Sequence, residues 1–415
     1  MDGERTIHRL QQALLEPSLT VEIISSLANI EPAQWNRLTS GNPFLRHEFL
    51  HALHETGCAS ERTGWAPRYL AAFEEGQLTG AMPLYVKSHS RGEYVFDWAW
   101  ADAYERHGLQ YYPKLLCAIP FTPVSGPRIL GESAVVIESL AAKVLDVARD
   151  SDASSLHCLF PPDAQMRLFK NKGMMVRHGV QFHWVNEGDA SFNEYLARLN
   201  HAKRKKIKQE RRKVVEAGIT FRWLEGATIT ENDWSFFARC YTRTYREHHN
   251  TPYLNEDFFQ RIGKTMPENM LLIVAERNGA PIAASFNVRS ADRLYGRYWG
   301  AIEHHPMLHF EACYYQTIEY CLARESSKAR RIITVLFNAL LAEPKLLPPD
   351  FQARARRQTA RHCRLHRRHD GSLCHAGAPA AVRGGAGLNH LCGRRIHIKR
   401  NALDAAFTIG AANPA

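Results

Sequence analysis

The chain repeats itself, and this repeat constrains the fold more than any other feature. The stretch "NPFLRHEFL" at 42–50 resembles "TPYLNEDFF" at 251–259, and "FEEGQLTGAMPL" at 73–84 resembles "ERNGAPIAASFN" at 276–287. The matches occur in the same order, at offsets of 209 and 203 residues. Two matches in register predict a tandem duplication.

Both halves have the hydrophobic patterns of a mixed α/β fold. In the first half we expect strands at 19–27, 68–74, 78–87, 93–98, 155–160 and 175–184, and helices at 32–38, 44–56 and 135–148. In the second half we expect strands at 219–224, 270–276, 281–288 and 293–299, and helices at 234–245, 256–265 and 310–322. The order of strand, helices, antiparallel hairpin and helix therefore occurs twice. This order predicts two similar α/β domains, each with a mixed sheet flanked by helices.

The net charge of +11 comes from the end of the chain. Residues 326–415 hold 16 Lys or Arg and 4 Asp or Glu, whereas residues 1–325 hold 37 and 38. All 8 Trp and all 15 Tyr precede residue 326. We therefore expect an N-terminal domain at 1–185, a C-terminal domain at 186–325, and a basic tail at 326–415 that is disordered or translated out of frame. Cys363, Cys374 and Cys392 in this tail match no regular zinc-ligand spacing.

The most charged stretch is "HAKRKKIKQERRKV" at 201–214, with eight Lys or Arg and one acid. Ser191 and Glu194 have capping-box spacing and Gly218 suits a helix end, so we expect a helix between them. Its cations are either solvated surface or a field that attracts phosphate. No aromatic residue is interleaved with them, which favours phosphate contact over base stacking. The apolar stripe is thin beyond Leu199, which argues against membrane binding.

A second candidate stretch is "YGRYWGAIEHHPMLHFEACYYQTIEY" at 295–320. Gly296 and Gly300 let the backbone approach a ligand or bend a strand, and the helix after Pro306 could hold an anion at its N-terminus. Candidate general bases or substrate ligands cluster here: His304, His305, His309 and Glu311. The alternative is a polar helix start above an apolar core. The histidines lack the adjacent acid of the zinc-protease pattern, so we expect no metal site.

These motifs resemble one family. "NPFLRHEFLHALHETG", "FTPVSGPRIL", "KRKKIKQERRKV", "PYLNEDFF" and the 295–320 stretch look like those of FemAB-like predicted N-acyltransferases, a bacterial group labelled peptidoglycan biosynthesis or recognition proteins. The resemblance covers residues 18–325 and implies two GNAT (N-acetyltransferase) domains in tandem. Beyond residue 325 the family's Gly-Ala-Gln-Gly-Glu-His-Lys segment is missing, which favours loss of the reading frame there.

The resemblance implies transfer of an acyl or aminoacyl group from an activated donor, acyl-CoA or aminoacyl-tRNA, to an amine acceptor. Such a site needs a backbone N–H for the oxyanion, a proton acceptor and a cationic groove for the donor's phosphates. His309 and Glu311 are the implied proton acceptors. The implied substrate- and phosphate-binding residues are Lys203, Arg204, Lys205, Arg211, Arg212, Arg297, Tyr298 and Tyr315. We expect acyl-CoA or aminoacyl-tRNA as co-substrate and no tightly bound cofactor.

Three functions remain open on the sequence alone. The first is an N-acyltransferase acting on a cell-wall precursor or another amine. The second is a non-catalytic protein that binds a glycan or nucleotide-linked precursor. The third is RNA contact through the basic helix, with tRNA as the donor; we expect no DNA partner. The N-terminus lacks the apolar core of a secretory signal and no apolar run reaches the roughly 18 residues of a membrane span, so we expect a cytoplasmic protein.

Overall fold

The second repeated stretch forms the same hairpin in both halves of the computed structural model. Both hairpins turn through two residues at positive φ, Glu75–Gly76 and Asn278–Gly279, as type I′ turns require. Each also has a β-bulge on the strand after the turn, where Thr79 in the first half and Ile282 in the second are extra residues. The two halves therefore share backbone geometry as well as sequence. The strands are β3 (Tyr69–Glu74), β4 (Gln77–Met82), β12 (Met270–Arg277) and β13 (Ala280–Arg289).

The first repeated stretch forms equivalent helices. α3 (His47–Glu55) and α10 (Glu256–Thr265) begin 209 residues apart. The equivalent side chains Phe49 and Phe258 pack edge to face, with ring centroids 5.5 Å apart, in one hydrophobic core that both halves share. The predicted duplication is confirmed by these two pairs of matching elements.

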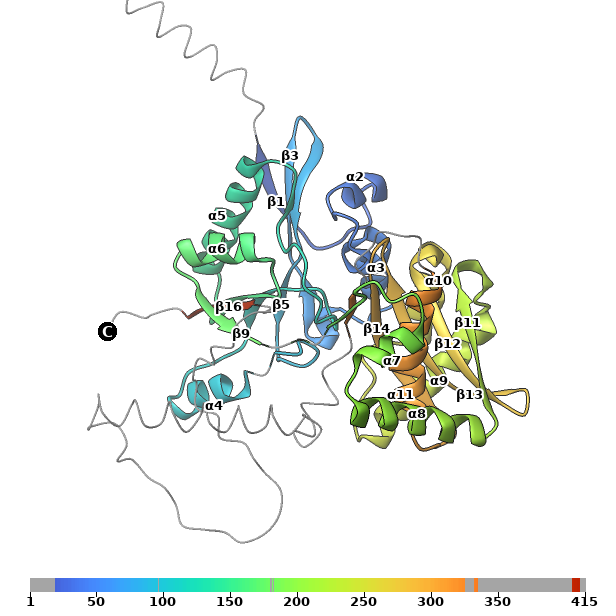
Figure 1. The fold of residues 1–415 in the computed structure, drawn as a ribbon. Coiled ribbons are helices and arrows are strands. Elements are labelled where there is room, and N and C mark those ends of the chain that lie inside the picture. The colour runs from blue at the N-terminus through green and yellow to red at the C-terminus, as the bar shows by residue number, and fades with distance from the viewer. Residues whose placement is uncertain are drawn as a thin grey trace, which may run out of the picture. The chain divides into compact units, whose positions relative to one another are not determined.

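The structure describes residues 19–95, 97–179, 181 and 183–324, and the backbone of two short strands at 332–334 and 405–410. The first half holds two sheets, with strand orders β1-β3-β4-β7 and β2-β5-β6-β8-β16-β9 (Figure 1). Helix α5 packs on β3 and β4 through its apolar face. The remaining elements are β1 (Thr20–Ile24), α2 (Pro32–Arg37), β2 (Trp65–Pro67), β5 (Leu84–Lys87), α4 (Trp98–Arg106), β6 (Lys114–Cys117), β7 (Leu130–Gly131), α5 (Ala134–Asp150), β8 (Ser155–Leu159), α6 (Asp163–Asn171) and β9 (Met175–His178).

The second half is built on one mixed sheet with the order β10-β15-β14-β13-β12-β11. β14 runs antiparallel to β13 and parallel to β15, so it lies inside the sheet. Helices α9 and α10 pack against each other, and α9 lies on β13 and β14. The elements are β10 (His183–Val185), α7 (Phe192–Arg198), α8 (His201–Glu216), β11 (Ile219–Glu225), α9 (Glu231–Glu247), β14 (Leu294–Ala301), α11 (Leu308–Phe310), α12 (Gln316–Ala323) and β15 (Ile332–Thr334).

The predicted strand at 93–98 is wrong. Tyr94 has a φ of 61°, which an extended strand does not allow, and Asp97 is the N-cap of α4. The carboxylates of Glu93 and Asp97 turn inward to the ammonium of Lys114 instead of alternating across a sheet. A buried ion pair with a distant residue therefore overrides the local strand pattern.

The basic helix is shorter than predicted. The helix expected after Ser191 divides into α7 and α8, because Leu199 is extended and the side chain of Asn200 caps a new helix by accepting from the backbone N–H of Lys203. Gly218 follows the end of α8 at a φ of 71°, as its predicted capping position requires.

Two short strands come from the predicted tail. β15 joins the sheet of the second half, and β16 (Ala405–Gly410) lies between β8 and β9 of the first. The rest of 326–415, including Cys363, Cys374 and Cys392, lies outside the described residues. The domain boundaries at 185 and 325, and the disordered or out-of-frame origin of the tail, stay predictions.

Candidate functional site

The β14 strand carries a bulge within the most distinctive predicted motif. Phe286 of β13 pairs with Tyr298, and the next residue, Asn287, pairs with Gly296, so Arg297 is an extra residue on β14. A bulge turns one backbone N–H out of the ladder. An N–H freed in this way inside a sheet can donate to an oxyanion, which is the geometry that acyl transfer needs.

The side chains of Arg297 and Tyr298 both contact the first half. The Arg297 guanidinium donates to the carbonyl oxygen of Phe121 and lies 5.3 Å from the ring centroid of Phe44. The Tyr298 hydroxyl donates to the same carbonyl at 3.1 Å. The residue at which they converge, Phe121, has a φ of 56°. Both predicted binding residues therefore fix a left-handed turn of the first half beside the bulge.

The predicted catalytic residues lie in a helix with a π turn. A single helical path runs through α11, the π turn Glu311–Tyr315 and α12. π turns are rare and often occur at functional sites. His309 packs between the rings of Trp299 and Tyr314, with centroids 5.6 and 5.8 Å away, and burial lowers its pKa to about 4. Its imidazole is therefore neutral near pH 7.

Glu311 is held in an ion-pair network with the basic helix. The guanidinium of Arg211 donates to Glu311 at 2.9 to 3.1 Å and to Glu319 at 2.7 and 3.0 Å. The same guanidinium lies 4.5 Å from the ring centroid of Phe192. At the preceding position of α8, Glu210 accepts from the hydroxyl of Tyr315. The structure thus brings together Arg211, Glu311 and Tyr315, and their contacts attach α8 to the π turn.

The other predicted cations of α8 lie apart from this network. Lys203, Lys205 and Arg212 are exposed and Arg204 is half-buried. Arg212 pairs on the surface with Glu216 at 3.4 Å. The first turn of α8 contains no acidic residue, so its cations add to the positive end of the helix dipole. Among the described contacts, none joins Lys203, Arg204 or Lys205 to the bulge at Arg297.

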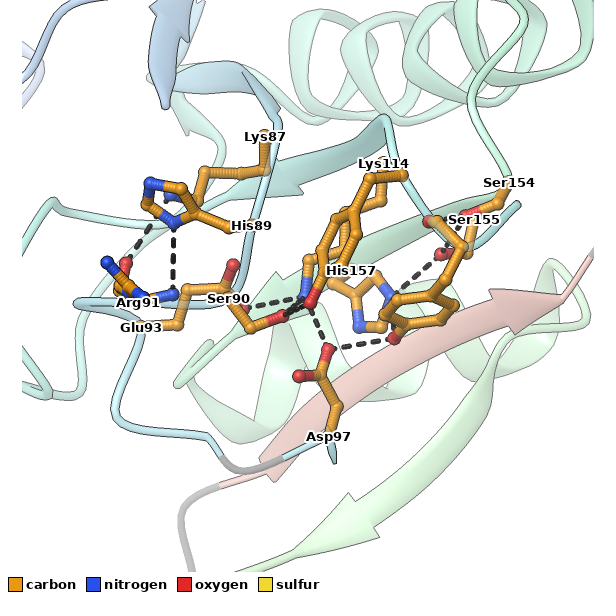
Figure 2. Close-up of polar contacts among 12 residues, drawn as sticks. Lys87, His89, Ser90, Arg91, Glu93, Asp97, Lys114, Ser154, Ser155 and His157 are labelled. Atoms are coloured by element: carbon orange, nitrogen blue, oxygen red, sulfur yellow. Dashed lines mark hydrogen bonds and ion pairs between the residues drawn. The ribbon is translucent and has the colours of Figure 1, made fainter. Parts of the chain in front are cut away.

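Sequence reasoning missed a buried ionic cluster in the first half (Figure 2). Lys87 of β5 and Lys114 of β6 lie directly opposite each other, and both are fully buried. The Lys114 ammonium donates to Ser90 at 2.7 Å, to Glu93 at 2.9 Å and to Asp97. Like charges opposite each other in a sheet are destabilising, so this arrangement needs the two carboxylates.

The rest of the cluster is less completely paired. The Lys87 ammonium lies 3.8 Å from the ring centroid of Trp65 and donates to the carbonyl of Arg91 at 3.4 Å. Burial lowers the pKa of Lys87 to about 7 and raises the pKa of Glu93 to about 7. Burial also lowers the pKa of His157, which bonds Ser155 at 2.8 Å, to about 3. A buried cluster with strongly shifted pKa values is a candidate functional site.

No local signal would have found this cluster. Lys87 ends one apolar strand and Lys114 begins another, and lysines at strand ends are usually solvent-exposed. Only the pairing of β5 with β6 places them together. The sequence holds one weak hint, the acids Glu93 and Asp97 in an otherwise aromatic stretch.

A family model described as peptidoglycan biosynthesis/recognition, FemAB-like, matches residues 26–329. The chain belongs to the FemAB-like family. The match includes the repeated stretches, the basic helix, the β14 bulge and the π turn. The family's tandem GNAT architecture agrees with the two similar halves, so the predicted family and fold class are confirmed. A model described as a phosphohydrolase-associated domain also matches residues 314–368, most of which lie outside the described part of the chain.

Solved structures similar to this FemAB-like protein have little sequence identity with it. FemX is 10% identical, with 74% of this chain and 88% of FemX covered and a TM-score of 0.45. L-PGS from Bacillus licheniformis is 9% identical (75% and 77% covered, TM-score 0.44). A tandem GNAT protein from the clavulanic acid biosynthesis pathway is 11% identical (77% and 90% covered, TM-score 0.40). No curated protein matches the chain. No helix within the described residues is long and apolar enough to cross a membrane.

Proposed function

We propose that this FemAB-like protein is an N-acyltransferase that moves an acyl or aminoacyl group from an activated donor to an amine acceptor. The observation that carries the proposal is the β14 bulge at Arg297, inside the family match. The acceptor nitrogen attacks the donor carbonyl, and the backbone N–H at the bulge stabilises the oxyanion that forms. This attack forms the C–N bond. Collapse of the oxyanion then breaks the donor's C–S or C–O bond, and the leaving group takes a proton.

The acceptor nitrogen must lose a proton during this reaction. Of the two predicted acceptors, His309 is supported better than Glu311. Its imidazole is neutral near pH 7 and can accept a proton, and burial, which lowers its pKa to about 4, makes it a weaker base than a solvated histidine. Glu311 already accepts from Arg211 and Gln316 and lies within the ion-pair network. We therefore assign proton acceptance to His309 and an anchoring role to Glu311.

The donor's phosphates are assigned to the first turn of α8. Lys203 and Lys205 are exposed there, Arg204 is half-buried, and the helix dipole adds positive potential at the same end. This chemistry suits both acyl-CoA and a charged tRNA, and the family description points to a cell-wall precursor as the acceptor.

A transfer assay tests the proposal. Wild-type protein is incubated with radiolabelled acyl-CoA or aminoacyl-tRNA and an amine-bearing cell-wall precursor, and amide formation is measured. Reversing Lys203, Arg204 and Lys205 to Glu should weaken donor binding by about 100-fold, because several charge-assisted contacts are lost. The matched control reverses three exposed cations of α9 and α10, Arg239, Arg261 and Lys264.

Donor binding that the α8 reversal leaves unchanged would refute the phosphate assignment. Ligand binding by wild-type protein without transfer from either donor would instead identify a non-catalytic precursor-binding protein.

A further inference from the structure

The buried cluster of the first half contains hydrogen-bond acceptors with no partner. Glu93 uses its Oε2 atom, and Asp97 its Oδ2 atom, to accept from Lys114. Among the described residues, nothing donates to Glu93 Oε1 or Asp97 Oδ1. Both residues are almost fully buried, at 4% and 2% exposure. An unpaired buried carboxylate oxygen costs about 1–3 kcal/mol or more, so both atoms are suited to receive a donor from outside the chain.

The cluster also contains an ammonium group with spare donors. An ammonium has three N–H donors. Lys114 uses all three, on Ser90, Glu93 and Asp97. Lys87 has one described hydrogen bond, at 3.4 Å to a carbonyl, and one face against Trp65. Lys87 lies directly opposite Lys114 in the pairing of β5 with β6, so the two side chains lie on the same face of the sheet.

The balance of charge restricts the ligand class. Two lysines and two carboxylates make the cluster neutral when all four are ionised. A lone cation or anion would bury an uncompensated charge there, which is strongly unfavourable. A zwitterion adds no net charge: its ammonium can donate to Glu93 Oε1 and Asp97 Oδ1, and its carboxylate can accept from Lys87.

We propose that Lys87, Glu93, Asp97 and Lys114 form a second ligand site, which binds an α-amino-acid head group carrying an ammonium and a carboxylate on one carbon. Figure 2 shows Lys87, Glu93, Asp97 and Lys114 gathered in one part of the first half. The head group belongs to a free amino acid or to the end of a larger compound. Among the described residues, no hydrogen bond or ion pair joins these four side chains to Arg297 or Tyr298, and the proposal does not depend on acyl transfer.

Helix α4 provides the route of entry. None of its side chains is buried, and Trp98 and Trp100 are 48% and 43% exposed. Its N-cap residue, Asp97, makes no capping hydrogen bond, because its carboxylate is directed at Lys114. A helix with so few buried contacts opens at low free-energy cost. Displacing α4 exposes Asp97 and the cluster behind it.

The decisive experiment uses wild-type protein and three small probes of similar size. Alanine carries both charged groups, ethylamine only the ammonium and propionate only the carboxylate. Calorimetric titration should show saturable binding of alanine. The affinities for ethylamine and propionate should be lower than that for alanine by about tenfold or more, since each lacks one charged contact. Nε-acetyl-lysine tests a larger compound that ends in the same head group. Binding of alanine or of Nε-acetyl-lysine supports the site. Comparing the two affinities shows whether the site prefers a small free amino acid or the head group of a larger compound.

Two variants assign the binding to the cluster. Glu93→Gln keeps the shape but loses the charge, and Lys87→Met removes the ammonium; each should weaken alanine binding by about tenfold or more. The matched control is Glu105→Gln, which removes an exposed carboxylate from α4 itself. The wild-type probe series decides the question even where a variant fails to fold. The proposal is overturned if neither alanine nor Nε-acetyl-lysine binds, if ethylamine binds as well as alanine, or if folded Glu93→Gln protein retains full affinity.

Discussion

At the scale of single residues, the least foreseeable feature is the pair of buried lysines. Arg297 and Tyr298 were predicted from one continuous stretch that resembles a family motif, and their part in substrate binding stays a prediction. Lys87 and Lys114 lie 27 positions apart, and their partners come from a loop whose course depends on the positive φ of Tyr94. A pattern search along the chain cannot detect a cluster that exists only through strand pairing and loop geometry.

The ionisation of Glu93 predicts a pH dependence of stability. Burial raises its pKa from 4.5 to about 7, opposed by Lys114 and Lys87 and reinforced by Asp97. Between these values the folded state binds more protons than the unfolded state, so this group's contribution to stability falls as pH rises. The Glu93→Gln variant has no carboxyl group to titrate at this position, so its stability should not show this decrease. The free energy of unfolding of the variant should therefore rise relative to that of wild type between pH 4.5 and about 7. Urea denaturation at several pH values in this range measures both free energies, and parallel pH profiles for wild type and variant would contradict the prediction.

Arg211 and Arg212 are adjacent in sequence, but Arg211 pairs with a buried carboxylate and Arg212 with an exposed one. Arg211→Leu leaves the buried carboxylate of Glu311 without its cation and should cost about 3 kcal/mol of unfolding free energy. Arg212→Leu loses only an exposed pair and should change stability by less than about 0.5 kcal/mol. Chemical denaturation of both variants measures the difference. If Arg211→Leu protein were as stable as wild type but bound donor poorly, the residue would be a phosphate ligand rather than an anchor.

At the scale of elements, hydrophobic periodicity predicted the second half well. The helix expected at 256–265 is α10, and the strands expected at 270–276, 281–288 and 293–299 correspond to β12, β13 and β14. These elements bury one face or both against the core, which is the property that periodicity detects. Helix α4, which buries no side chain, was not predicted from the sequence.

Gly300 has a packing role that the sequence left open. A Cβ at this position would lie 2.2 Å from the carbonyl carbon and oxygen of Cys240 in α9. These are backbone atoms and cannot move aside, so Gly300→Ala should destabilise the protein by roughly 3 kcal/mol or more. Gly279→Ala is the matched control: it meets no atom within 4 Å and costs about 1 kcal/mol through its positive φ. Thermal melting compares them, and equal losses would argue against the helix–strand contact.

At the scale of the whole molecule, the two halves form one hydrophobic core, to which Phe49 and Phe258 both belong. A double-mutant cycle with Phe49→Leu and Phe258→Leu should give a coupling energy of about 0.5–1.5 kcal/mol, the range for aromatic pairs in contact. Phe49→Leu combined with Phe169→Leu, which lies in a separate cluster, should be additive within about 0.5 kcal/mol. Additive behaviour of both pairs would mean that the halves do not meet at these rings.

The contact between Phe49 and Phe258 has a further consequence. The two residues occupy the same position in the repeat and nevertheless touch each other. In the isologous interface of a homodimer, residues beside the two-fold axis likewise meet their own copies. In a homodimer of a single ancestral domain, one phenylalanine would meet its own copy, and every substitution would appear twice. Two copies in one chain are free of that restriction. In this chain the second half has the bulged strand β14, and the first half has the buried ionic cluster.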